Sequence, residues 1–158
     1  MNTAREMTRR DFIKATGLFT GGLAVGSLTF LSGCGFPAAP GIDHDAYILD
    51  GDHLTVRLDK TPQLSRVGDS AAVIDEKNNI RLIIARTGET KYVVALNECP
   101  HREKQLGYDS SSETFLCVTG KSEFKPDGSY VKGPVEAPLR IYRSTLEGKT
   151  LIIDLKNG

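Results

Sequence analysis

Cysteine and histidine are scarce in this sequence, and charge of one sign is not clustered. The lack of charge clusters and the lack of catalytic motifs each argue against a class of function. The 158 residues carry 20 Lys and Arg against 20 Asp and Glu, so the formal net charge is zero. No segment forms the basic stripe expected of a protein that binds nucleic acid, and we expect no nucleic-acid partner. Paired carboxylates, a nucleophile elbow and a phosphate-binding glycine loop are missing too, so we expect no independent catalytic site.

Helical periodicity, internal repeats and low-complexity tracts are also absent, and short β-rich runs take their place. These runs lie at 54–58, 71–74, 80–86, 91–96, 114–118, 122–124, 141–142 and 150–155, with turn residues between them. The runs at 80–86 and 91–96 are joined by four residues, a hairpin length. The segment 125–128 has the composition of a turn. The pattern predicts one all-β domain, a small antiparallel barrel or sandwich.

The first 34 residues have the features of a bacterial export signal. Arg9 and Arg10 open a twin-arginine pattern, and a weakly apolar stretch diluted by glycine follows. The segment 31–34 is similar to a lipobox, in which the thiol of Cys34 takes the lipid. We therefore expect a twin-arginine lipoprotein signal peptide at 1–33, a lipidated N-terminus and Pro/Gly-rich linker at 34–45, and a folded domain at 46–158.

An uncleaved anchor is the alternative, because residues 15–36 are just long enough to span a bilayer as a helix. Either anchor places the domain on the extracytoplasmic, periplasmic side of a bacterial membrane, where disulfides are permitted. Residues 1–33 hold four basic and two acidic side chains, so the remainder has 16 basic and 18 acidic groups and a net charge of −2.

Two of the three cysteines lie outside the export signal, and one of the three histidines stands beside the first of them. Cys99-Pro100-His101 forms a C-x-H pair, and Cys117 follows at the end of a predicted strand. This spacing puts thiolate and imidazole donors on two separate loops. Such donors hold iron-sulfur clusters and zinc ions.

The residues around these donors resemble the Rieske [2Fe-2S] family. Its first loop carries a C-x-H pair, and its second runs F-x-C-P-C-H-G-S-x-F, followed by G-P, P-L and a tyrosine. The residues in register are Phe115, Cys117, Ser122, Phe124, Gly128, Gly133-Pro134, Pro138-Leu139 and Tyr142, with Tyr108-Asp109 earlier. The resemblance covers about 54–155. It implies a Rieske-like fold with two cluster-binding-type loops, Cys99, His101 and Cys117 as cluster ligands, and Ser122 beside them.

The sequence departs from the family where the cluster is held. Gly120 stands in the place of the second histidine, and Lys121 in that of the glycine after it. Lys104 and Thr119 replace a pair of cysteines that joins the two loops in many members. Three protein ligands remain for a [2Fe-2S] cluster. The candidates for the fourth position are Lys121, Ser122, Glu123, His44, His53 and water. In protein without a cluster, we expect a disulfide between Cys99 and Cys117. It would take the place of the disulfide that many members form at positions 104 and 119.

These features favour a membrane-tethered, extracytoplasmic Rieske-family protein associated with respiratory electron transfer, with weakened or lost [2Fe-2S] binding. The alternatives are a functional electron-transfer cluster with a non-standard fourth ligand and, ranked lower, a mononuclear metal site. The expected partners are the membrane, through the lipid anchor, and a respiratory membrane complex or a cytochrome-type redox protein. The charges near the site are Arg102, Lys104, Lys121, Glu98, Glu103 and Glu123. Such a mixture is typical of a solvated face, and recognition of a charged protein partner is the other interpretation.

Overall fold

The computed structural model describes residues 35–157, and the predicted signal peptide and Cys34 lie outside this range. The described chain is built of strands, which confirms the all-β prediction. They are β1 (Tyr47–Asp50), β2 (His53–Arg57), β3 (Ser70–Asp75), β4 (Ile80–Arg86), β5 (Tyr92–Leu96), β6 (Leu106–Asp109), β7 (Thr114–Cys117), β8 (Glu123–Phe124), β9 (Tyr130–Lys132), β10 (Ile141–Glu147) and β11 (Thr150–Asp154). Three single 3-10 turns, η1 (His44–Ala46), η2 (Leu58–Lys60) and η3 (Pro62–Leu64), complete the described elements. Within 35–157, no helix has the length and apolar character needed to cross a membrane.

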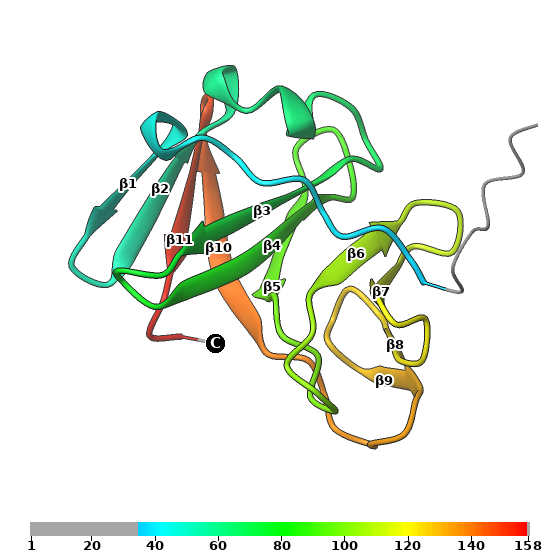
Figure 1. The fold of residues 1–158 in the computed structure, drawn as a ribbon. Coiled ribbons are helices and arrows are strands. Elements are labelled where there is room, and N and C mark those ends of the chain that lie inside the picture. Colours follow the sequence, from blue (N-terminus) through cyan, green and yellow to red (C-terminus); the bar gives the residue numbers. More distant parts are fainter. Residues whose placement is uncertain (1–34, 158) are drawn as a thin grey trace, which may run out of the picture. The chain divides into compact units, whose positions relative to one another are not determined.

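The strands form two antiparallel sheets (Figure 1). The larger sheet has seven strands in the order β1-β2-β11-β10-β5-β4-β3, and the smaller has four in the order β6-β7-β8-β9. Strand β10 holds the larger sheet together, because Ile141 and Tyr142 pair with β5 while the following residues pair with β11. The four-stranded sheet is inserted in the chain between β5 and β10.

The strands β3, β4 and β5 are buried on both faces, which explains their nearly continuous apolar sequence. In β4, Leu82 and Ile84 belong to one core cluster, whereas Ile83 and Ala85 belong to another. The first cluster lies within the seven-stranded sheet and includes Leu54, Val56, Val94, Leu151 and Ile153. The second joins β3–β5 to the smaller sheet and includes Leu106, Phe115, Phe124, Leu139 and both described cysteines. Each fully buried aliphatic or aromatic side chain stabilises the fold by roughly 1.5–3 kcal/mol.

The observed strands overlap all eight predicted runs, and the predicted hairpin is confirmed. Strands β4 and β5 pair in register from Leu82↔Leu96 to Arg86↔Tyr92. The turn at 125–128 is also present, since the Gly128 N–H donates to Lys125 and Gly128 has φ = +86°. Three strands, β1, β6 and β9, were not predicted, and β10 continues well beyond the predicted 141–142.

Residues 36–42 already bond to the domain, ahead of its predicted start near residue 46. The N–H groups of Phe36, Ala39 and Ile42 donate to the carbonyls of Val118, Leu106 and Ala72 at 3.0–3.1 Å. Gly41 also bridges Ala72, and the side chain of Ala39 is buried. The Pro/Gly composition of this segment suggested a spacer, but the segment instead runs along β6 and on to the edge strand β3.

Candidate metal centre

The first loop of the site lies between β5 and β6 and is shaped by hydrogen bonds around Cys99. The Cys99 N–H donates to the Lys104 carbonyl at 2.8 Å, and the Cys99 carbonyl accepts from the N–H of Glu103 at 2.8 Å. At the base of the loop, buried Asn97 donates its N–H to Arg81 and accepts from the Leu106 N–H through Oδ1. Hydrogen bonds therefore close the loop both around Cys99 and at its base.

The second loop follows β7 and is equally tight. The Cys117 N–H donates to the Ser122 carbonyl at 2.9 Å, and the Cys117 carbonyl accepts from the Gly120 N–H at 2.7 Å. Gly120 has φ = +69°, a conformation that favours glycine and that Asn, Asp and His also adopt. The Val118 N–H donates to Gln105 of the first loop, which fixes the two loops side by side.

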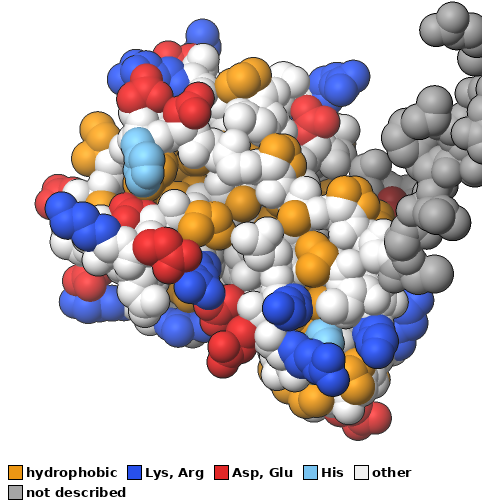
Figure 2. Space-filling model, viewed as in Figure 1, with side chains coloured by type: hydrophobic (Ala, Val, Ile, Leu, Met, Phe, Trp, Pro, Cys, Tyr) orange, Lys and Arg blue, Asp and Glu red, His pale blue; other side chains and the backbone are white. Residues whose placement is uncertain are grey.

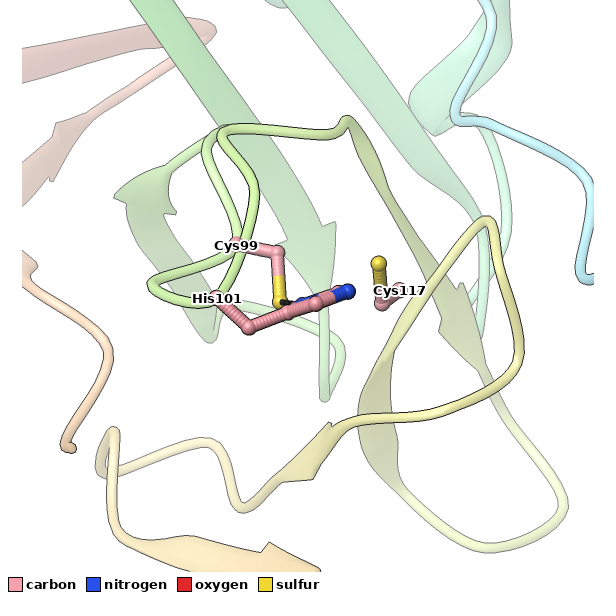
Figure 3. Close-up of side chains that lie close together, drawn as sticks. All are labelled: Cys99, His101 and Cys117. Atoms are coloured by element: carbon pink, nitrogen blue, oxygen red, sulfur yellow. Dashed lines mark hydrogen bonds between the residues drawn. The ribbon is translucent and has the colours of Figure 1, made fainter. Parts of the chain in front are cut away.

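The two loops bring Cys99, His101 and Cys117 together (Figure 3), as the sequence predicted. One donor atom from each residue lies within 4.8 Å of the others. His101 Nδ1 is 2.7 Å from Cys99 Sγ, and the imidazole ring extends from the first loop toward Cys117. Within residues 35–157, no other His, Cys, Asp or Glu joins this metal-binding group.

The metal-binding group is largely shielded from solvent. Cys99 and Cys117 are 1% and 0% exposed, and both are free thiols. Burial raises the pKa of the Cys99 thiol, and a hydrogen bond from Ser122 acts in the opposite direction. The Nε2 atom of His101 is buried and has no hydrogen-bond partner among residues 35–157. Two buried thiols beside an unsatisfied imidazole suit a thiophilic metal centre, so the donor types fit two thiolates and one imidazole of the expected ligand set. The set is one ligand short of four.

Ser122 lies beside this group. Its side chain is 2% exposed, and its Oγ is 3.3 Å from His101 Nδ1. Gly133 packs directly on it, because a Cβ at Gly133 would lie 2.7 Å from Ser122 Oγ. Thr119 contributes a contact that the sequence did not predict, with its hydroxyl 3.2 Å from Cys117 Sγ. Asn97 was missed as well, and its only sequence signal is its place two residues before Cys99.

The structure separates the candidates for the fourth position. His44 lies in η1 and is hydrogen-bonded to Tyr47 of β1, and His53 belongs to β2, so neither histidine joins the group. Glu123 is engaged elsewhere, with Lys132 at 2.7 Å and Thr114 at 3.1 Å. Lys121, Ser122 and water remain. Lys121 is exposed and lines a cavity of about 170 Å³ together with His101, Arg102, Pro134 and Val135.

The charges around the site are less mixed than the sequence suggested. Glu98 pairs with Arg81 at 3.2 Å and Glu123 with Lys132, so both carboxylates already have cationic partners. Lys132 and Thr114 hold the pKa of Glu123 below its usual value, with the Lys132 hydrogen bond as the main cause. Arg102, Lys104, Lys121 and Glu103 are exposed. Figure 2 shows Lys and Arg side chains gathered around a histidine on the part of the molecule that carries the smaller sheet.

Comparison with known proteins identifies the type of domain. The family model described as "Rieske [2Fe-2S] domain" matches residues 49–143. Among solved structures, the ferredoxin of carbazole 1,9a-dioxygenase from Nocardioides aromaticivorans IC177 is similar, with a TM-score of 0.52 and 21% identity over 63% of this chain and 96% of that one. The plasma membrane Rieske protein PetC3 from the cyanobacterium Synechocystis PCC 6803 gives a TM-score of 0.43 and 20% identity, over 47% of this chain and 76% of that one. No curated protein matches.

Proposed function

The chain belongs to the Rieske [2Fe-2S] family, and we propose that it is a membrane-tethered, extracytoplasmic member associated with respiratory electron transfer. We further propose that its site binds a [2Fe-2S] cluster weakly or no longer binds one. It then acts as a subunit or accessory module that keeps the scaffold, the tether and the contact surface of an electron-transfer domain. A cluster in this site would supply one-electron chemistry.

One observation carries the proposal of weakened binding: two thiols and one imidazole gather, and Gly120 stands where the second imidazole is expected. Gly120 forms a tight turn and has no side chain that can act as a ligand. No other His, Cys, Asp or Glu of residues 35–157 joins the three donors. An iron with an open position would exchange its ligand with solvent. Loss of one ligand therefore weakens retention of the whole centre.

The tether is proposed from the sequence. The arginine pair at Arg9-Arg10 and the lipobox-like end at Cys34 favour export through the twin-arginine route followed by lipidation. That route carries proteins that are already folded, as a cofactor-binding ancestor would require. The proposed redox partner is a respiratory membrane complex or a cytochrome-type protein.

A functional cluster with a non-standard ligand is the second candidate, and two positions favour it. Ser122 Oγ is buried 3.3 Å from His101 Nδ1, and Lys121 lines the cavity beside the same imidazole. Either side chain could approach the open position. A single metal ion held by the three donors ranks below this candidate, although it has the ligand count of catalytic zinc.

Restoring the missing ligand tests the proposal. Gly120→His with Lys121→Gly recreates the family's H-G pair on the second loop, and histidine tolerates the positive φ found there. Gly120→Asn with Lys121→Gly is the matched control, because asparagine also tolerates this φ but supplies no imidazole. Iron, acid-labile sulfide and visible absorption are measured after anaerobic reconstitution.

We expect the wild-type chain and the asparagine control to hold well under about two irons and two sulfides per chain, and the histidine variant to approach two of each. Two of each in the wild type would overturn the proposal of weakened binding. Lys121→Ala and Ser122→Ala would then show which side chain supplies the fourth ligand. Zinc bound at one per chain without sulfide would support the mononuclear site instead.

A further inference from the structure

The segment that follows Cys34 is fixed to the second loop of the site. The Phe36 N–H donates to the carbonyl of Val118 at 3.1 Å, and Val118 directly follows Cys117. Three residues later, the Ala39 N–H donates to Leu106 at the other loop's exit. The ring of Phe36 lies against Gly107, where an added Cβ would stand 2.7 Å from it. The first described residues are therefore bonded to the loops that hold the metal-binding group.

The distance from this start to the proposed anchor is short. Cys34 precedes Phe36 by two residues, which span at most about 7 Å when fully extended. A flexible linker over 34–45 would let the domain move freely above the membrane. Because residues 36–42 are instead bonded to β6 and β3, only the residues before Phe36 can act as a linker.

A surface patch at the site loops has the chemistry of a lipid contact. The cavity over His101 is lined by Arg102 and Lys121 and by the apolar Pro134 and Val135, without a carboxylate. Val135 is 42% exposed. Within residues 35–157, neither Arg102 nor Lys121 forms an ion pair. Cations with adjacent apolar side chains bind the phosphates and the upper chain region of an anionic bilayer.

We propose that the loop-end patch, formed by Arg102, Lys121, Pro134 and Val135, lies against anionic lipid headgroups, held there by the short connection from Phe36 to the lipid on Cys34. This inference rests on the proposed membrane tether. The inference adds an orientation to the proposed tether. The site faces the bilayer, and β1, at the opposite edge of the fold in Figure 1, faces away. An electron partner then has to reach the site from within the membrane plane.

The whole chain contains no tryptophan, so an introduced indole can be excited selectively at wavelengths where the five tyrosines absorb little. Val135→Trp places an indole probe in the loop-end patch, and Ile48→Trp places a matched probe on β1, where Ile48 is 59% exposed. The full lipidated chain is reconstituted into vesicles of phosphatidylglycerol and phosphatidylcholine that carry bromine near the headgroup end of the acyl chains. We expect bromine to quench the patch probe at least about threefold more strongly than the β1 probe, because interfacial side chains sit at this depth.

Two further variants separate the tether from the patch. Eight Gly/Ser residues inserted between Gly35 and Phe36 keep the bonds of Phe36 but add a flexible reach of about 16 Å, which should bring the quenching ratio close to one. Arg102→Glu with Lys121→Glu should lower the ratio in the anionic vesicles and leave it unchanged in pure phosphatidylcholine.

The two proposals fail in different ways. A chain that does not co-sediment with the vesicles overturns the proposed tether. A chain that co-sediments but shows equal quenching of the two probes overturns the orientation alone. Stronger quenching of the β1 probe than of the patch probe would reverse the proposed orientation.

Discussion

At the scale of single residues, main-chain hydrogen bonds hold the donors of the metal-binding group. Both the N–H and the carbonyl of Cys99 bond within the first loop, and those of Cys117 bond within the second. These bonds depend little on the side chains at neighbouring positions. The loops therefore keep their form whether or not position 120 carries an imidazole.

When no metal separates them, the two thiols are placed to be oxidised to a disulfide, with the oxidising exported compartment accepting the two electrons. Cys99 Sγ and Cys117 Sγ lie within 4.8 Å, and a disulfide needs about 2.05 Å. We predict that the chain, when purified without a cluster from the exported compartment, carries this disulfide. By closing a loop in the unfolded chain, the disulfide should stabilise the fold by roughly 3 kcal/mol. Thiol titration of denatured protein should find the pair only after reduction. Cys117→Ala should show one free thiol throughout, and two free thiols in unreduced wild type would contradict the prediction.

The ion pair behind the second loop gives a pH-dependent prediction. The pKa of Glu123 is lowered in the folded chain by Lys132 and Thr114, so the carboxylate stabilises the fold above its unfolded pKa. This stability is lost as the pH falls through the folded pKa. Glu123→Gln should cost roughly 1 kcal/mol at pH 7, and the difference should disappear in acid.

Urea unfolding at pH 7 and at a series of lower pH values measures this difference. Glu136→Gln is the control, because Glu136 is exposed and has no ion pair within residues 35–157. An equal loss for Glu123→Gln at every pH would show that its packing, rather than its charge, stabilises the loop.

The donors could be predicted from sequence, but their surroundings could not. The spacing of Cys99, His101 and Cys117 and the flanking register are local features of the chain. The contact of Gly133 with Ser122 and the bond from Leu106 to Asn97 join segments that only the folded sheets bring together. The exclusion of His44 and His53 likewise depends on where the fold places η1 and β2.

At the scale of elements, the β-rich runs of the sequence predicted eight strands, whereas the short strands β1, β6 and β9 were missed. Strands β3 to β5 contribute to both core clusters, so their sequence is strongly β-rich. In contrast, β6 contains Gly107 and ends in Asp109, and β9 has only three residues. These strands are set by pairing with their neighbours, which no local pattern records.

Gly107 is required for the N-terminal segment to lie along β6. An added Cβ would stand 2.1 Å from the Pro37 carbonyl oxygen, so Gly107→Ala must displace the segment. We expect a loss of about 1–3 kcal/mol in the free energy of unfolding and faster amide exchange at Phe36 and Ala39. Gly41→Ala is the control, since its Cβ would meet no atom within 4 Å. Unchanged exchange in Gly107→Ala would show that the segment is not held there.

At the scale of the whole molecule, membrane attachment is proposed to depend on one atom, the Sγ of Cys34. Cys34→Ala removes the thiol that would take the lipid, so the chain should move from the membrane fraction to the soluble fraction. Fractionation of cells followed by extraction at high salt measures this. Attachment that survives the substitution would favour the uncleaved helix over 15–36.

The division of the interior into two clusters has a consequence for the history of such a chain. The cluster within the seven-stranded sheet contains none of the three donors, so this part of the core does not depend directly on a bound cofactor. A mutation that deletes a ligand then leaves this part of the core intact. A gene copy can lose its redox chemistry by neutral drift while its product still reaches the membrane, and a former electron carrier can persist as an assembly partner.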